Sequence, residues 1–150
     1  MTNFELAGQI LILVILLVFS FIMSRYDLRS LAVPNWPYFV GYILIFLVRI
    51  IFYTATVYLN LLSAFILFDL YFAVRLITKN KLGKGDVFFG LFQGLCLAPK
   101  VLWICVAIEV LTAFIYGLIR FKTIKGIKFA FIPFMSIGLL TAFLIDWFVI

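Results

Sequence analysis

Long apolar runs alternate with short polar breaks along the whole chain, and each break contains charged residues or proline. A helix needs about 20 predominantly apolar residues to cross a bilayer. The pattern therefore predicts an all-α fold, a polytopic membrane helical bundle with about six transmembrane helices. The expected spans cover approximately residues 5–24, 38–56, 58–78, 86–98, 101–119 and 129–149.

Two features of this pattern are less distinct than the rest. The fourth span, 86–98, holds only about thirteen residues, so it either borrows residues from its flanks or lies in a sheltered or locally thinned place. The break around 54-TATVYLN-60 is weak as well. A five-span alternative that fuses neighbouring runs therefore stays open.

The composition supports a membrane protein with a single domain. Of the 150 residues, 67% are hydrophobic and 12% are charged, which is far from the balance of a soluble domain. The length leaves no room for an additional soluble domain of ordinary size, so residues 1–150 are expected to form one integral-membrane domain.

The basic residues predict an orientation in the membrane. With six spans, ten of the twelve lysines and arginines fall in breaks on one side, while Lys100 lies opposite and Arg49 lies within a span. The positive-inside rule makes the basic side cytoplasmic and places both termini outside. The ten residues are Arg25, Arg29, Arg75, Lys79, Lys81, Lys84, Arg120, Lys122, Lys125 and Lys128.

Several chemistries are excluded or disfavoured by the residues themselves. The chain has no histidine, which excludes Ser-His-Asp and Cys-His catalysis and H-E-x-x-H zinc proteases. Cys96 and Cys105 lack C-x-x-C spacing, so we expect no metal and no cofactor. The basic residues behind the net charge of +6 cluster in the short breaks between apolar runs, which is typical of membrane topology, so no nucleic acid partner is expected. The basic run 120-RFKTIKGIK-128 is expected to contact anionic lipids.

Two aspartates are expected at the cytoplasmic boundary. Asp27 follows the first span in 24-SRYDLRSLAVPNWP-37, and Asp86 opens the fourth span in 82-LGKGDVFFG-90. Two carboxyl groups at one depth can hydrolyse a peptide bond, because the ionised one takes a proton from water and the protonated one donates to the carbonyl oxygen. Close approach keeps both from ionising together, so the pair titrates as a unit.

The residues around the two aspartates fit such a site. Gly83 and Gly85 are expected to form a tight turn and to let a substrate backbone approach Asp86. Pro34 and Pro37 are expected to stop helix propagation after Asp27 and to hold its loop in a defined shape.

Two motifs resemble those of a known family. The segments 27-DLRSLAVPNW-36 and 83-GKGDVFFG-90 are similar to the type IV prepilin peptidases, membrane aspartyl proteases of the G-x-G-D type. In that family an aspartate precedes Ile/Val-Pro-Asn, here 33-VPN-35, and a second aspartate closes G-x-G-D, here 83-GKGD-86. The late segment 131-FIPFMSIG-138 resembles the final span of the family in Pro133 and Phe134.

The resemblance implies an activity and its residues. Asp27 and Asp86 would be the catalytic pair of an aspartic-type endopeptidase in the inner (cytoplasmic) membrane. The residues implied to support their loops are Gly83, Gly85, Pro34 and Asn35. The substrate would be a prepilin-like precursor, cut at the cytoplasmic face between a short basic leader and a hydrophobic helix. The chain lacks the two C-x-x-C pairs of members that also methylate, so peptidase activity without methyl transfer is expected.

Two alternatives stay open at this point. Tyr26 before Asp27, together with G-x-G-D, also resembles the presenilin and signal-peptide-peptidase group, although the Pro-Ala-Leu motif of that group is absent. The second alternative is a non-enzymatic transport or assembly protein that uses the ionisable residues inside the spans, namely Arg49, Asp69 and Glu109.

Two further expectations concern packing within the bundle. Arg49 is expected to pair with Asp69 or Glu109, because charges in hydrocarbon usually face a partner, while a wetted polar route to the aspartates is the functional rival. Gly90 and Gly94 form G-x-x-x-G, which predicts close helix packing.

Overall fold

The computed structural model describes residues 2–120 and 129–148, and all regular structure in them is helical. The predicted all-α membrane bundle is confirmed, with six α-helices and two short 3₁₀ turns in the described residues. The elements are α1 (Asn3–Ser30), α2 (Asn35–Phe52), η1 (Thr54–Thr56), α3 (Val57–Ile77), α4 (Lys84–Cys96), η2 (Pro99–Val101), α5 (Leu102–Arg120) and α6 (Ile132–Phe148).

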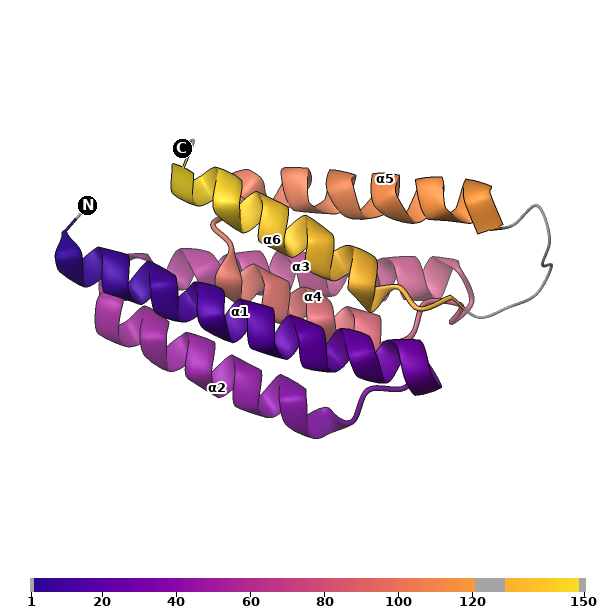
Figure 1. The fold of residues 1–150 in the computed structure, drawn as a ribbon, viewed down its shortest axis with the longest axis horizontal. Helices are drawn as coiled ribbons and strands as arrows, with labels where there is room; N and C mark the ends of the chain where they lie inside the picture. Colours follow the sequence, from indigo (N-terminus) through magenta and orange to yellow (C-terminus); the bar gives the residue numbers. More distant parts are fainter. Residues whose placement is uncertain (1, 121–128, 149–150) are drawn as a thin grey trace.

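The helices run alternately in opposite directions, so that the start of α1 and the end of α6 lie at the same end of the bundle (Figure 1). Among the described residues, four segments are long and apolar enough to cross a membrane: α1, α2, Thr54–Ile77 and Pro99–Arg120. Helix α6 is apolar but shorter. The five-span alternative is wrong for the second and third runs, because η1 separates α2 from α3.

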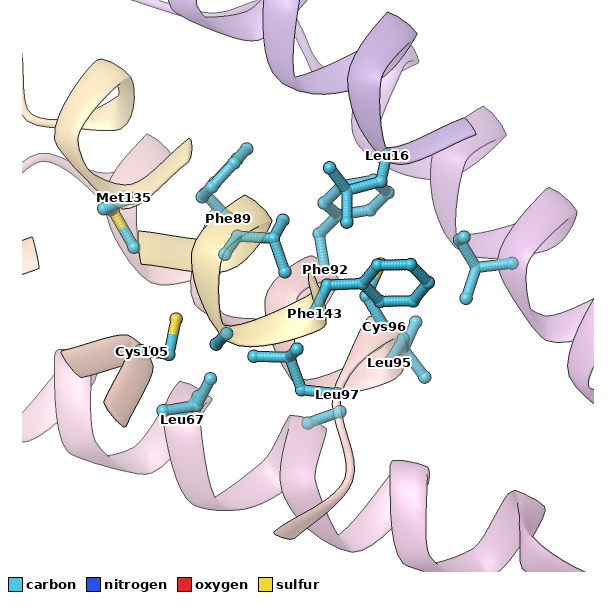
Figure 2. Close-up of a cluster of buried hydrophobic side chains, with 14 of the residues drawn as sticks. Leu16, Leu67, Phe89, Phe92, Leu95, Cys96, Leu97, Cys105, Met135 and Phe143 are labelled. Atoms are coloured by element: carbon cyan, nitrogen blue, oxygen red, sulfur yellow. The ribbon is translucent and has the colours of Figure 1, made fainter. Parts of the chain in front are cut away.

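The short helix α4 is sheltered inside the bundle. It has 13 residues, about 20 Å at 1.5 Å per residue, against a hydrocarbon core of about 30 Å. It packs on α3 most extensively, and on α2 and α6 as well. Figure 2 shows Phe89, Phe92 and Leu95 of α4 in the core, close to Leu16 of α1 and Phe143 of α6. Of the two explanations for its shortness, the structure therefore supports the sheltered place.

Buried side chains donate hydrogen bonds to the backbone carbonyl oxygens at the C-terminal end of α4. Arg49 donates from Nε to the carbonyl oxygen of Leu95 at 3.3 Å and from Nη2 to that of Cys96 at 2.5 Å. Asn60 donates to the carbonyl oxygen of Leu97 at 2.9 Å. A helix that ends inside a bilayer leaves carbonyl groups that no water can reach, so such partners are required.

The expected pairing of Arg49 with an acid is therefore wrong. The guanidinium contacts the negative end of a helix dipole and lies 5.3 Å from the ring centre of Tyr53. Glu109 is fully buried and accepts hydrogen bonds from Tyr71, Gln93 and Cys105. Because Gln93 also donates to the Met135 carbonyl oxygen at 2.9 Å, this network joins α3, α4, α5 and α6.

Arg49→Leu is expected to lower the free energy of unfolding by about 1.5–3 kcal/mol, the range for a hydrogen bond to a charged group. The reason is that two buried carbonyl oxygens at the end of α4 would lose their donor. Denaturant titration in detergent micelles measures this loss. Arg49→Lys, which keeps the charge, should lose less, and equal stability of Arg49→Leu and the parent would contradict the interpretation.

The G-x-x-x-G prediction of close packing is confirmed. A Cβ atom on Gly94 would lie 2.2 Å from Cα of Ala64, and one on Gly90 would lie 2.3 Å from Cδ2 of Tyr71. Both neighbours belong to α3. The two glycines thus let α4 lie directly against the backbone and side chains of α3, which fixes the depth of the helix that begins beside Asp86.

Candidate active site

Asp27 lies within α1 and not in the loop that follows it. Helix α1 has 28 residues, about 42 Å of helix, which is longer than a hydrocarbon core of about 30 Å. It ends where Leu31 adopts a left-handed conformation (φ 54°), and the Leu31 N–H donates to the Asp27 carbonyl oxygen at 2.9 Å. The backbone at Asp27 is therefore held by the helix itself.

The role expected for the two prolines is correspondingly wrong. Pro34 immediately precedes α2 and caps its start, and Pro37 lies in the first turn of α2. Proline is tolerated there because the first N–H groups of a helix have no intrahelical acceptor. The two prolines therefore lie at the start of α2, whereas α1 ends four residues before Pro34.

The Asp27 carboxylate contacts a helix that is distant in the sequence. Its Oδ2 accepts a hydrogen bond from the backbone N–H of Ile132 at 3.0 Å, and the residue is 7% exposed. Ile132 is the first residue of α6, so the carboxylate lies at the positive end of that helix. The sequence interpretation missed this contact. Its only signal was Pro133, a residue type that favours the first turn of a helix.

Asp86 lies in the first turn of α4 and is held by the chain just before it. Its Oδ2 accepts a hydrogen bond from the Gly83 N–H at 2.9 Å, and the residue is 7% exposed. Arg75 donates to the Leu82 carbonyl oxygen at 2.6 Å, which anchors the segment leading into Gly83.

The two glycines before Asp86 provide space and not a left-handed turn. Gly83 has φ −65°, and the left-handed residues of this connection are Lys79 and Asn80. A Cβ on Gly83 would lie 3.0 Å from Oδ2 of Asp86, and one on Gly85 would lie 3.0 Å from the hydroxyl of Tyr38. The expected tight turn at the glycines is therefore wrong, while the close approach of polar groups explains both positions.

Tyr38 joins the two halves of the site, and the sequence interpretation missed it. The side chain is 3% exposed, and its hydroxyl donates to the Gly85 carbonyl oxygen at 3.0 Å. This bond ties α2 to the first turn of α4. The available signal was its position, one turn after Asn35 on the same face of a helix.

Asp27 and Asp86 line the same cavity, which has a volume of about 280 Å³. Of the six residues predicted for the site, only Pro34 is absent from this lining. The lining consists of Asp27, Leu31, Ala32, Val33, Asn35, Tyr38, Gly83, Lys84, Gly85, Asp86 and Phe88. Within residues 2–120 and 129–148, no three Asp, Glu or Cys side chains gather closely enough to hold a metal ion.

The arrangement brings two buried carboxyl groups to one cavity. Each accepts a backbone N–H at the start of a helix, Asp27 from α6 and Asp86 from α4. Like charges in a poorly solvated space resist simultaneous ionisation. The geometry thus provides a base, an acid and room for water between α1 and α4.

Comparisons with known proteins place the chain in a family. No curated protein and no solved structure matches it. A family model matches residues 14–118, a range that runs from α1 to α5 and includes both aspartates. The model describes the type IV leader peptidase family, in agreement with the motifs at 27–36 and 83–90. The chain therefore belongs to the type IV leader peptidase family.

Proposed function

We propose that this protein is an aspartic-type endopeptidase that removes the short basic leader of prepilin-like precursors, with Asp27 and Asp86 as its catalytic pair. Membership of the family makes the chain a leader-peptidase-like protease of the membrane. The observation that carries the finer proposal is the shared cavity, because it is lined by both aspartates of the two motifs.

The proposed reaction uses one water molecule between the two carboxyl groups. The ionised carboxylate takes a proton from this water, and the resulting hydroxide attacks the scissile carbonyl carbon. The protonated carboxyl donates its proton to the carbonyl oxygen. When the C–N bond of the tetrahedral intermediate breaks, one carboxyl group protonates the leaving amine and the other takes a proton from a hydroxyl of the intermediate as the carbonyl re-forms, so the pair again holds one proton. Gly83 and Gly85 line the cavity beside Asp86, where the substrate backbone would lie.

We place the cavity at the cytoplasmic face of the inner membrane. The end of the bundle that carries Asp27 and Asp86 also carries seven described basic residues, and the positive-inside rule favours the cytoplasm for that end. The seven are Arg25, Arg29, Arg75, Lys79, Lys81, Lys84 and Arg120. Most of the run 120–128, expected to contact anionic lipids, lies outside the described residues. Both chain termini would then be outside.

We further propose that the chain acts as a peptidase without methyl transfer. The two cysteines, Cys96 and Cys105, are free and buried in the bundle core, and the sequence contains no C-x-x-C pair. The alternative functions have less support. Arg49 and Glu109 serve packing contacts inside the bundle, and the family match favours leader peptidases over the presenilin group.

The experiment that tests this proposal is cleavage of a defined precursor by the full chain in lipid vesicles. The precursor carries a short basic leader that ends in glycine, followed by a hydrophobic helix. The expected result is a single cut after the glycine, identified by the masses of both products. A precursor with lysine in place of that glycine is the matched control. Absence of cleavage across several glycine-ending precursors would contradict the proposal.

Tyr38→Phe is expected to reduce kcat about fivefold, which corresponds to the loss of one hydrogen bond of about 1 kcal/mol. The hydroxyl holds the Gly85 carbonyl, and its loss would loosen the turn that positions Asp86. Kinetics on the same precursor measures the effect. Tyr58→Phe, at a residue that is 63% exposed, should leave kcat unchanged. Equal rates for both variants would contradict a positioning role for Tyr38.

A further inference from the structure

An apolar groove lies between α2 and α3, with α4 as its floor. Both helices pack on α4 and hardly touch each other, which leaves a space of about 230 Å³ between them. Side chains that line it include Ile43 and Phe46 of α2, Phe65 of α3, and Leu91 and Leu95 of α4. No charged side chain is part of the lining.

The groove adjoins the cavity of the two aspartates along α2 and α4. Along α2, Tyr38 lines the cavity and Tyr42, one turn further, lines the groove. Along α4, Phe88 lines the cavity and Leu91 lines the groove. The Tyr42 hydroxyl donates to the Phe88 carbonyl oxygen at 2.7 Å, so a single aromatic layer separates the two spaces. A chain that leaves the cavity along α4 therefore enters the groove.

Asp69 lies on the exposed face of α3 beside this groove. Exposed residues at helical spacing form one stripe along α3, and Phe65 of this stripe lines the groove. The stripe consists of Leu62, Phe65, Asp69, Phe72 and Leu76. Gly90 packs against Leu67 and Tyr71, which places Asp69 level with Gly90, four residues or about 6 Å past Asp86. Asp69 has no hydrogen bond or ion pair to a described residue.

An unpaired carboxylate argues against a cover of lipid tails. An aspartate that faces hydrocarbon costs about 2.5–3.5 kcal/mol at the centre of a membrane helix, and such residues usually face a partner or a cavity. An acyl chain would fill the apolar groove but offers Asp69 no donor. A polypeptide helix suits both the groove and Asp69, because its apolar side chains can fill the groove and one of its polar groups can donate a hydrogen bond to Asp69.

We propose that the groove between α2 and α3 receives the first turns of the substrate's hydrophobic helix and that Asp69 accepts a hydrogen bond from it. This inference rests on the proposed function, in which cleavage occurs just before that helix. The precursor would lie with its scissile bond at Asp27 and Asp86, and the helix after the cut would continue along α4 between the two walls. Asp69 would then determine specificity about one turn beyond the cut.

Disulfide cross-linking tests where the helix lies. Ile43→Cys and Phe65→Cys report on the groove, and both residues are 58% exposed. Val110→Cys and Phe114→Cys, at positions 57% and 61% exposed, report on an apolar hollow of α5 and serve as matched controls. The native cysteines are buried and should not react. Each variant also carries Asp86→Asn to arrest cleavage, and the precursor has one cysteine two turns past the cut.

The expected result is at least tenfold more cross-linked precursor with the two groove variants than with the two α5 variants. Excess cysteine-free precursor should suppress the cross-linking at the groove. Equal yields at both pairs would overturn the inference. Cross-linking between two copies of the Ile43→Cys protein, unaffected by precursor, would assign the groove to a second copy. If no cross-link forms while the parent cleaves the same precursor, the groove is not the binding place of the substrate helix, and the proposed function still stands. No cleavage by the parent would overturn the proposed function and this inference with it.

Kinetics separates a role in binding from a role in folding for Asp69. Asp69→Leu is expected to change KM by a factor about ten times larger than its effect on kcat. This factor corresponds to the loss of one hydrogen bond to a charged group. The same variant should be at least as stable as the parent, because it removes an unpaired acid. Asp69→Asn, which keeps an acceptor oxygen, should raise KM less. An unchanged KM in Asp69→Leu would overturn the role of Asp69.

Discussion

Asp27→Asn and Asp86→Asn are each expected to lower kcat for precursor cleavage by about two to four orders of magnitude, the range for loss of general acid–base catalysis. Both carboxyl groups line one cavity, and no third carboxyl group is part of that lining. Asparagine is nearly isosteric with aspartate. It keeps the oxygen that accepts the N–H of Ile132 or Gly83, so the helices should stay in place.

Rates on a glycine-ending precursor in lipid vesicles measure this loss. Asp146→Asn is the matched control, because Asp146 pairs with Lys100 at 3.0 Å at the opposite end of the bundle. It should retain the parental rate. Circular dichroism of each variant would show that the helices are intact. Full activity of either site variant would reject the catalytic pair, whereas a loss in all three variants would indicate general destabilisation.

Gly94→Leu is expected to prevent stable folding of the bundle. A Cβ at this position would lie 2.2 Å from the Cα of Ala64, and no flexible side chain stands between the two backbones. Helices α3 and α4 would have to separate, and overpacking of this kind costs about 1–3 kcal/mol or more. Because α4 begins at Lys84 beside Asp86, any displacement would also move the site.

The yield of monodisperse protein in detergent and its thermal unfolding measure this effect. Gly94→Ala should fall between Gly94→Leu and the parent, because its added methyl group is smaller. Ala73→Leu, on the exposed face of α3, should behave like the parent. Gly94→Leu with parental stability would show that α3 and α4 do not depend on this close contact.

The sequence alone predicted the fold class and five of the residues that line the cavity, because these depend on local patterns. Polar breaks separate the apolar runs that form the helices, and the motifs at 27–36 and 83–90 contain Asp27 and Asp86. The partner of Asp27 could not be predicted in the same way. It is a backbone N–H of Ile132, and every residue type except proline supplies that donor.

The charged residues inside the spans show a second limit of sequence reasoning. Pairing opposite charges at similar depth was the natural expectation for Arg49, yet its acceptors are backbone carbonyl groups at the end of α4. Carbonyls at a helix end carry partial negative charge in every sequence, so no residue type marks them. The helical position of Asp27 was missed for a related reason, because the polar segment after residue 24 resembles a loop although it continues α1 to Ser30.

The most direct test of the two-aspartate site compares the parent, Asp27→Asn, Asp86→Asn and the double variant on one precursor under identical conditions. Residues that act as a unit give strongly non-additive losses. If the two carboxyl groups share one water and one proton, the double variant should be no slower than the slower single variant, within about twofold. Losses that multiply, or full cleavage by either single variant, would contradict the account.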